Sequence, residues 1–548
     1  MKQIDGATLR LMILNASAAV ENEKQSLNEL NVFPVPDGDT GTNMSLTLMA
    51  AAGELANVPA DSSISAVSDI AARAMVRGAR GNSGVILSLL FRGFGRRLKD
   101  LTDMDGTVFA DAMRAGVQSA YKAVMKPAEG TILTVSRVSS ESAAQSAVEN
   151  PEAESVISDM IASATVALAE TVHQNPVLEK AGVVDAGAKG FLVILEAMLK
   201  GLNGETVVSE SGGVVMKSAA VFSDFATEDI TFGYCTEFIV NLDPKMAPTC
   251  TKLRAFLDSI GDSLVFVEDE DIIKIHVHTN DPGRAISEGL KYGSLSRMKI
   301  DNMREQHTEK VIITGAEPVH AGERVVAAPE KRYGIVAVSV GDGIHDVFTD
   351  MGADNIVEGG QTMNPSTEDI LNAIDKTPAE VVFVFPNNKN IIMAAEQCVA
   401  MSDKTVVIIP TKTVPQGVAA LLNFDPDLDP KRNREQMLSA ISKVRTGQIT
   451  YAARDSSFDG KKIKEGDYLS ILEGELISNN KAVATVLKRL ARDMSKKSAE
   501  FVTIFYGLDV SEEAAEQTRE LFSREFADAE INLVYGGQPV YYYLISAE

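Results

Sequence analysis

Two aspartates one residue apart lie in the segment NVFPVPDGDTGTNM, residues 31–44. Asp37 and Asp39 flank Gly38, and two carboxylates this close repel each other unless a hard cation such as Mg2+ binds between them. The two prolines before them hold the backbone extended, which predicts a loop between helices. The segment is therefore either a magnesium site or a helix-capping turn.

The residues that follow the two aspartates suit an anionic ligand. Gly41 lets the backbone come close to a ligand, and Thr42 and Asn43 supply polar side chains. We expect them where the next helix begins, and a helix N-terminus favours anions such as phosphate.

A second glycine-rich turn, GARGNSGV, covers residues 78–85. Gly81 and Gly84 would let backbone amides approach phosphate oxygens, and Asn82 or Ser83 would cap the following helix. The chain has neither the GxxxxGK[ST] of a P-loop nor a GxGxxG after a strand, so the common nucleotide-binding motifs are excluded.

Two further segments place small and polar residues at expected helix ends, GTILTVSR (130–137) and AGVVDAGAKGF (181–191). An ordinary turn between helices is the alternative interpretation of both.

A basic stretch leads into the glycine-rich turn. From Arg73 to Lys99 there are seven basic residues and no acidic one. Arg73, Arg77 and Arg80 share one helix face, which indicates either a phosphate-related role or a solvated surface.

The elements that must position these segments are helices. Through residues 1–203 apolar residues recur at three- and four-residue spacing, which predicts an all-α bundle or helical barrel. Residues 204–325 have the pattern of a small α+β domain with one helix. Residues 333–548 alternate strand and helix, which predicts an α/β domain with a mainly parallel sheet.

The middle domain carries a possible ligand set for a transition metal. His276 and His278 lie two apart in a predicted strand, so they share a face, and Cys235 in a neighbouring strand would complete three ligands for Zn2+. A structural strand pair with a buried cysteine is the alternative.

In the C-terminal domain, the segments 359–366 and 387–390 lie at strand ends, where α/β folds bind ligands. A surface for a protein partner is the alternative for both. Tyr541, Tyr542 and Tyr543 are either contacts for such a partner or members of a terminal core strand.

Composition limits the function classes. The chain has 548 residues and a net charge of -24, so a general nucleic-acid binder is excluded. Three scattered cysteines form no disulfide framework and fit a reducing compartment. No signal peptide is evident and the longest apolar runs are strand-length, so we expect a cytoplasmic protein without membrane insertion.

Taken together, the four helix-end segments resemble the ATP-binding L subunit of the dihydroxyacetone kinases, a helical barrel around Mg-ATP. The order of helical, middle and α/β domains is similar to that of the catalytic subunit of bacterial fatty acid kinase, and this resemblance covers the whole chain. PVPDGDTGTNM and GARGNSG are the specific motifs. The family's C-terminal domain is similar to the DegV fold.

The resemblance implies the roles of individual residues. Asp37 and Asp39 would bind two magnesium ions, and Asn31 lies nearest the place of a further aspartate in the L subunit. The residues expected to bind ATP are Thr40, Gly41, Thr42, Asn43, Gly81, Asn82, Ser83, Thr131, Leu133, Asp185 and Gly187.

The resemblance also implies an activity and a partner. The chain would transfer phosphate from ATP to a fatty acid carboxylate held by a DegV-type carrier protein, giving acyl phosphate for phospholipid synthesis, and it could form a homodimer. A carboxylate is ionised at pH 7, so no general base is required. Two alternatives are a kinase for dihydroxyacetone or another small polyol, with His345 as the candidate substrate-binding histidine, and a metal-dependent scaffold with a degenerate kinase domain.

Overall fold

The structure is a computed structural model that describes residues 3–31, 38–124, 127–209, 234–242, 251–268, 272–302, 326–360, 363–458 and 461–548, with only part of the side chains in 234–302. The chain forms two compact units. One unit is Met216–Arg324, and the other joins Met1–Val215 to Val325–Glu548.

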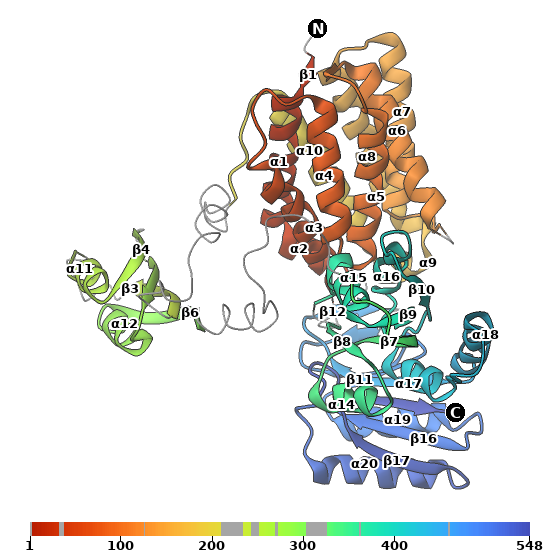
Figure 1. Ribbon diagram of the computed structural model, residues 1–548. Helices are drawn as coiled ribbons and strands as arrows, with labels where there is room; N and C mark the ends of the chain where they lie inside the picture. The colour runs from red at the N-terminus through yellow and green to blue at the C-terminus, as the bar shows by residue number, and fades with distance from the viewer. Residues whose placement is uncertain are drawn as a thin grey trace. The chain divides into compact units, whose positions relative to one another are not determined.

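The N-terminal part is a helical bundle, as predicted (Figure 1). Side chains of Asp5, Ser63, Asp105 and Asn175 each accept a hydrogen bond from a backbone N–H in the first turn of a helix, which fixes where these helices begin. Its helices are α1 (Gly6–Asn22), α2 (Lys24–Glu29), α3 (Thr40–Leu55), α4 (Ile64–Gly78), α5 (Gly81–Arg97), α6 (Gly106–Ala123), α7 (Ile132–Glu149), α8 (Ala153–Gln174), α9 (Pro176–Ala181) and α10 (Ala186–Leu202).

Two short strands join the segment before α1 to the segment between α5 and α6. Strand β1 (Ile4–Asp5) pairs antiparallel with β2 (Asp103–Met104), and Ile4 and Met104 are both buried. The sequence pattern did not predict these strands, because two residues carry no period.

Helix α8 is apolar over much of its length, although polar residues interrupt its apolar runs. By length and composition it could cross a membrane, with a mean hydropathy of 1.3 over its best window. One face of α8, which includes Val156, Ile157 and Met160, is buried in the hydrophobic core of the bundle. The apolar residues of that face are therefore used in helix packing.

The middle unit is a four-stranded antiparallel sheet with two helices. The sheet order is β4-β5-β3-β6, and apolar side chains of α11, α12 and the sheet form one core. The second helix, α12, corrects the expectation of one. The elements are β3 (Tyr234–Leu242), α11 (Thr251–Ile260), β4 (Gly261–Glu268), β5 (Ile272–Thr279), α12 (Pro282–Gly289) and β6 (Gly293–Asn302).

The first half of the C-terminal part has the predicted α/β alternation. Its sheet is parallel, in the order β10-β9-β7-β8. Helices α15 and α16 pack against α4 and α5 of the bundle and share its core. The elements are β7 (Lys331–Ser339), α14 (Asp342–Asp350), β8 (Asn355–Glu358), α15 (Thr367–Lys376), β9 (Ala379–Phe385), α16 (Ile392–Val399), β10 (Thr405–Ile408), α17 (Val414–Leu422) and α18 (Pro430–Ile441).

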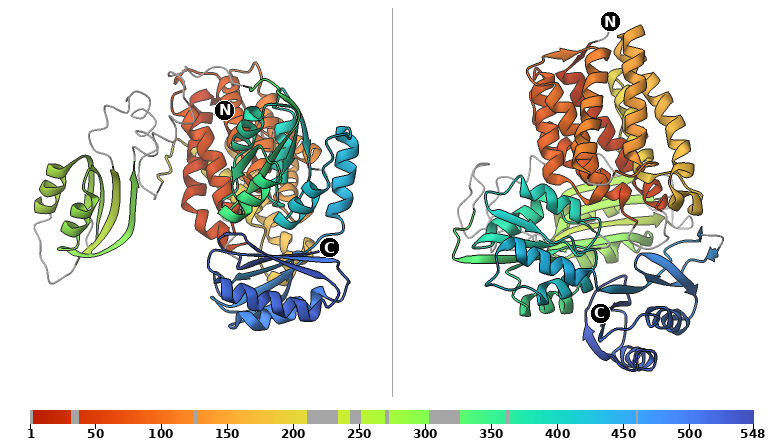
Figure 2. Two further views of the ribbon diagram at one scale, coloured as in Figure 1. Left: turned by 60° about the horizontal axis from the view of Figure 1, so that its bottom comes forward. Right: turned by 90° about the vertical axis from the view of Figure 1, so that its right-hand side faces the viewer.

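The second half departs from the prediction of a mainly parallel sheet. Its six-stranded sheet has the order β15-β14-β11-β18-β16-β17, and only β16 and β17 are parallel. Figure 2 shows this sheet in blue with its helices against one face. The elements are β11 (Arg445–Tyr451), the paired β12 (Ser456–Phe458) and β13 (Lys461–Ile463), β14 (Tyr468–Leu472), β15 (Glu475–Asn480), α19 (Val483–Met494), β16 (Phe501–Tyr506), α20 (Glu512–Glu525), β17 (Glu530–Tyr535) and β18 (Tyr543–Ala547).

The terminal tyrosines belong to two hydrophobic clusters, since Tyr541 packs with residues of β7 and β9, and Tyr542 and Tyr543 pack in the core of this second half. Tyr541 and Tyr543 are 4% and 3% exposed. The ring of Tyr542 packs edge-on against Tyr451 and Tyr468. Of the two interpretations of these tyrosines, the structure therefore favours a core strand over a partner surface.

Candidate functional site

A cavity of about 870 Å³ is lined by both the helical bundle and the α/β part. It contains most of the site residues that the sequence analysis singled out. Those that line it are Asn31, Asp39, Thr40, Asn43, Asn82, Ser83, Thr131, Leu133, Asp185 and Gly187. Gly41, Thr42 and Gly81 do not line it, and Asp37 lies outside the described residues.

Asp39 is the acidic residue of the first turn that the structure describes. It precedes α3, but its side chain makes no capping hydrogen bond to that helix. The carboxylate is buried and accepts a hydrogen bond from the side-chain amide of Asn364. The carboxylate is therefore used in a contact with the α/β part and not as a cap of α3.

Gly41 and Thr42 follow Asp39 in the sequence but do not line the cavity, and both contact helix α2. The side chain of Asn28 bonds both the hydroxyl and the backbone N–H of Thr42, at 3.0 and 3.1 Å. A Cβ on Gly41 would lie 2.1 Å from the carbonyl oxygen of Lys24. The glycine therefore permits close packing of α2 on α3, and its approach to a ligand stays a prediction.

The second turn joins α4 to α5 beside Asn43. Gly81 has a φ of +56°, and a Cβ there would lie 2.3 Å from Nδ2 of Asn43. The N-cap of α5 is Arg80, which makes no side-chain cap, so the expected capping by Asn82 or Ser83 is wrong. Both side chains instead face the cavity at the first turn of α5.

The third and fourth segments meet at Asp185. Its Oδ1 accepts hydrogen bonds from the N–H of Ala188 in α10, at 2.7 Å, and of Ile132 in α7, at 3.0 Å. Burial raises the pKa of Asp185 to about 6, although the two N–H donors act in the opposite direction. Thr131 caps α7 by accepting from the N–H of Leu133.

The α/β part closes the cavity from the other side. Asn388, Lys389 and Asn390 from the loop after β9 line it, as do Lys412 and Thr413 from the loop before α17. The amide of Asn82 donates to Oδ1 of Asn390 at 3.4 Å. Segment 387–390 was expected to bind a ligand or a protein partner, but no sequence pattern connects it to the N-terminal motifs.

The basic stretch corrects our expectation about the ATP site. Arg73, Arg77, Arg92, Arg96 and Lys99 line a separate cavity of about 690 Å³, which includes none of the expected ATP-binding residues. Arg73 pairs with Asp69 at 2.8 Å, and Arg77 pairs with Glu54. Of the three arginines that were expected to share a face, Arg80 does not line this second cavity and contacts Asn364 and Asp369 of the α/β part.

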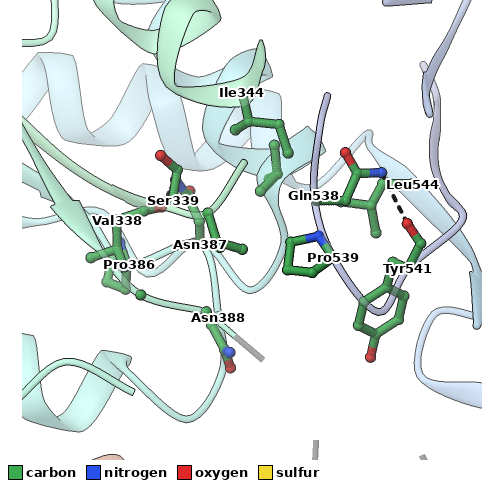
Figure 3. Close-up of a pocket in the computed structure, with 14 residues that line it drawn as sticks. Val338, Ser339, Ile344, Pro386, Asn387, Asn388, Gln538, Pro539, Tyr541 and Leu544 are labelled. Carbon is green, nitrogen blue, oxygen red and sulfur yellow. Dashed lines mark hydrogen bonds between the residues drawn. The ribbon is translucent and has the colours of Figure 1, made fainter. Parts of the chain in front are cut away.

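A small cavity lies at the carboxyl ends of β7 and β9 (Figure 3). Ser339, Asn387 and Gln538 are among its polar lining residues, and Gln538 donates to the carbonyl oxygen of Tyr541 at 3.2 Å. Its volume is about 30 Å³, room for about one water molecule. This small cavity therefore has no space for an acyl chain.

In the middle unit the backbone register pairs Cys235 with His278, and His276 with Glu237 and Val265. The side chains of the cysteine and the two histidines lie outside the described part. Among the side chains that are described, no three His, Cys, Asp or Glu come together as metal ligands. The zinc site stays a prediction.

The donors beside Asp39 fit a hard divalent cation. Oδ1 of Asn82 and Oδ1 of Asn364 are buried and have no hydrogen-bond partner among the described residues. A carboxylate with amide oxygens nearby is an oxygen-donor set of the kind that Mg2+ takes in proteins.

Comparison with known proteins gives the class and then the family. Residues 34–200 match the DAK2 domain, so the chain carries a kinase domain. Residues 231–310 and 334–548 match the middle and C-terminal domains of the FakA-like proteins, a family of fatty acid kinase subunits. The chain belongs to the FakA-like fatty acid kinase family, which confirms the resemblance seen in the sequence.

Similar proteins span the full chain. Protein YloV of Bacillus subtilis (strain 168) is 42% identical over 558 residues, and an uncharacterized protein of Staphylococcus aureus (strain USA300) is 37% identical over 554, each covering 100% of both chains. A DegV family protein of Corynebacterium glutamicum matches 39% of this chain and 96% of its own at 12% identity and a TM-score of 0.31. The dihydroxyacetone kinase of C. freundii matches 36% of each chain at 19% identity and a TM-score of 0.28.

Proposed function

We propose that this protein transfers the γ-phosphoryl group of ATP to the carboxylate of a fatty acid, giving acyl phosphate and ADP. The observation that carries the proposal is the single cavity in which four separate helix-end segments of the DAK2 domain converge. In the reaction a carboxylate oxygen forms a bond to the γ-phosphorus, the bond to the β–γ bridging oxygen breaks, and ADP leaves with that electron pair.

The chain's own residues supply binding and positioning. The first turn of α5, with Asn82 and Ser83, faces the cavity with backbone N–H groups that suit phosphate oxygens. Lys389 and Lys412 add positive charge from the α/β part. Asp37 and Asp39 would hold Mg2+, with Asn31 near Asp39 through the hydrogen bond from Thr40 to Asn31, 2.9 Å long. Magnesium bound there would neutralise charge on the phosphate oxygens.

The lining of the cavity favours an acceptor that is already ionised. The described residues that line the cavity include no histidine, and His345, the candidate for a dihydroxyacetone kinase, lies in α14 away from it. A fatty acid carboxylate needs no deprotonation at neutral pH. We therefore favour the carboxylate acceptor over a sugar or ketone hydroxyl.

The proposal includes a DegV-type carrier, because a long acyl chain is poorly soluble and the small cavity in the α/β part has no room for one. It also includes a cytoplasmic location. The carrier would present the carboxylate to the larger cavity from outside the chain.

The test supplies γ-labelled ATP with oleate and a DegV-type carrier, or with dihydroxyacetone. We expect label in acyl phosphate that depends on the carrier. Labelling of dihydroxyacetone and not of oleate would refute the proposal, and no transfer to either acceptor would favour the scaffold alternative.

A further inference from the structure

The loop before α15 brings one polar side chain of the α/β part onto the candidate metal site. Asn364 is 1% exposed, and its amide nitrogen donates to Asp39 and, at 3.4 Å, to Oδ1 of Asn43. Asp39 and Asn364 are 325 residues apart in the chain. The contact therefore joins the helical bundle to the α/β part of the same compact unit, at the residue proposed to bind magnesium.

The turn between α4 and α5 fixes the position of Asn364. The guanidinium of Arg80 donates to the carbonyl oxygen of Asn364 at 2.8 Å and pairs with Asp369 at 3.5 Å. Arg80 also forms a β-bridge with Ser366, and the N–H of Thr367 donates to the carbonyl oxygen of Ala79 at 3.1 Å. The backbone on both sides of the asparagine is thus held before any ligand binds.

The side chain of Asn364 is not explained by packing alone. Its Oδ1 is buried without a hydrogen-bond partner among the described residues, which costs free energy unless a further group donates to it. Asn82, which lines the same cavity as Asp39, has an Oδ1 in the same state. A buried amide oxygen without a donor, on a side chain that contacts a buried carboxylate, points to a ligand with donors of its own, such as a hydrated cation.

We propose that Asn364 is a positioning residue for the magnesium site. Its amide nitrogen orients the carboxylate of Asp39, and its amide oxygen accepts a hydrogen bond from a water molecule of the bound ion. Groups that hold a metal ligand in this way change metal affinity by about 10–100-fold when removed. The metal affinity of the DAK2 domain then depends on the α/β part. This inference rests on the proposed function only in requiring a magnesium site at Asp39.

The experiment measures Mn2+ affinity of the full chain by electron paramagnetic resonance with ADP present and no fatty acid or carrier. We expect Asn364→Leu, which keeps the volume and removes both polar atoms, to weaken Mn2+ binding about tenfold or more. Asn364→Ala is the second variant, in case the leucine disturbs folding. The matched control is Thr367→Val at the first residue of α15, which loses the 3.5 Å hydrogen bond from its hydroxyl to the carbonyl oxygen of Ala79 and keeps the backbone hydrogen bond to the same oxygen.

The control should bind Mn2+ within about twofold of the wild type. Mn2+ affinity that is unchanged in both Asn364 variants would overturn the inference and leave the asparagine as an interdomain contact. The outcome is separable from that of the proposed function. A protein that phosphorylates oleate but shows no change of Mn2+ affinity in the variants refutes the inference alone, and one that shows the change but spares oleate refutes the proposed acceptor alone.

Discussion

Asp185 joins two helices through a single oxygen, because the Oδ1 that caps α10 also accepts the backbone N–H of Ile132, the first residue of α7, at 3.0 Å. The segments 130–137 and 181–191, which both contain residues expected to bind ATP, are therefore held together by one side chain. Burial raises the pKa of that side chain to about 6.

The raised pKa predicts a pH-dependent stability. In the unfolded chain the carboxyl has an ordinary pKa near 3.8, so the folded state binds its proton more tightly, and the contribution to stability falls as pH rises through about 4 to 6. Asp185→Asn keeps the acceptor oxygen and removes the charge. The difference in free energy of unfolding, variant minus wild type, should increase by about 1 kcal/mol from pH 5 to pH 8. Urea unfolding at several pH values measures this, and a constant difference would contradict the pKa.

We expect an alanine at Gly81 to weaken ADP binding, and an alanine at a second glycine, Gly182, to leave it unchanged. Gly81→Ala places a side chain at a φ of +56° and against Nδ2 of Asn43, so we expect a loss of about 2 kcal/mol in stability and at least tenfold weaker ADP binding. Gly182 is the control, because its φ of +68° is similar and a Cβ there meets nothing within 4 Å. Gly182→Ala should lose about 1 kcal/mol and leave ADP affinity, measured by calorimetry, unchanged. Equal effects of both variants on ADP binding would remove Gly81 from the site.

Asp39 should be essential for transfer but not for folding. Since its side chain does not cap α3, Asp39→Asn should keep the helical circular dichroism while kcat falls at least about 100-fold. Asp61→Asn, in an exposed turn before α4, is the control and should keep full activity. Near-normal kcat in the Asp39 variant would rule out its role as a magnesium ligand.

We expect the middle unit to bind zinc. The register places Cys235 opposite His278 on neighbouring strands, and we propose that these two and His276 bind Zn2+. Elemental analysis of the purified protein should find about one zinc per chain, and Cys235→Ala should lower this content. Metal-free protein purified without chelators would favour the structural strand pair.

The sequence was sufficient to find the segments of the site, but not to predict whether each contacts a ligand or a neighbouring part of the chain. Glycine, aspartate and asparagine at helix ends were sufficient to select the four segments, since helices that end at such residues leave polar groups for a ligand or a neighbour. Local sequence does not distinguish these two uses. At Gly41 the close approach is that of Lys24 on α2, and at Arg80 the guanidinium contacts Asn364 and Asp369 of the α/β part.

Order along the chain also misled the prediction of the last sheet. The final strand β18 pairs antiparallel with both β11 and β16, so it lies inside the sheet rather than at an edge. Alternation of strand and helix predicts parallel neighbours only when successive strands pair. The basic stretch failed for a similar reason. Arg92 follows Gly81 by eleven residues of α5, about 16 Å along the helix, so closeness in sequence did not place it at the turn.

The pairing of Asp39 with Asn364 has a consequence for synthesis of the protein. The asparagine leaves the ribosome 325 residues after the aspartate, a delay of about 16–65 s at bacterial or eukaryotic rates of translation. The helical bundle emerges long before the loop that completes its acidic turn. In a nascent or truncated chain Asp39 would lack the amide of Asn364, so we expect the metal site to be weaker until the α/β part has docked.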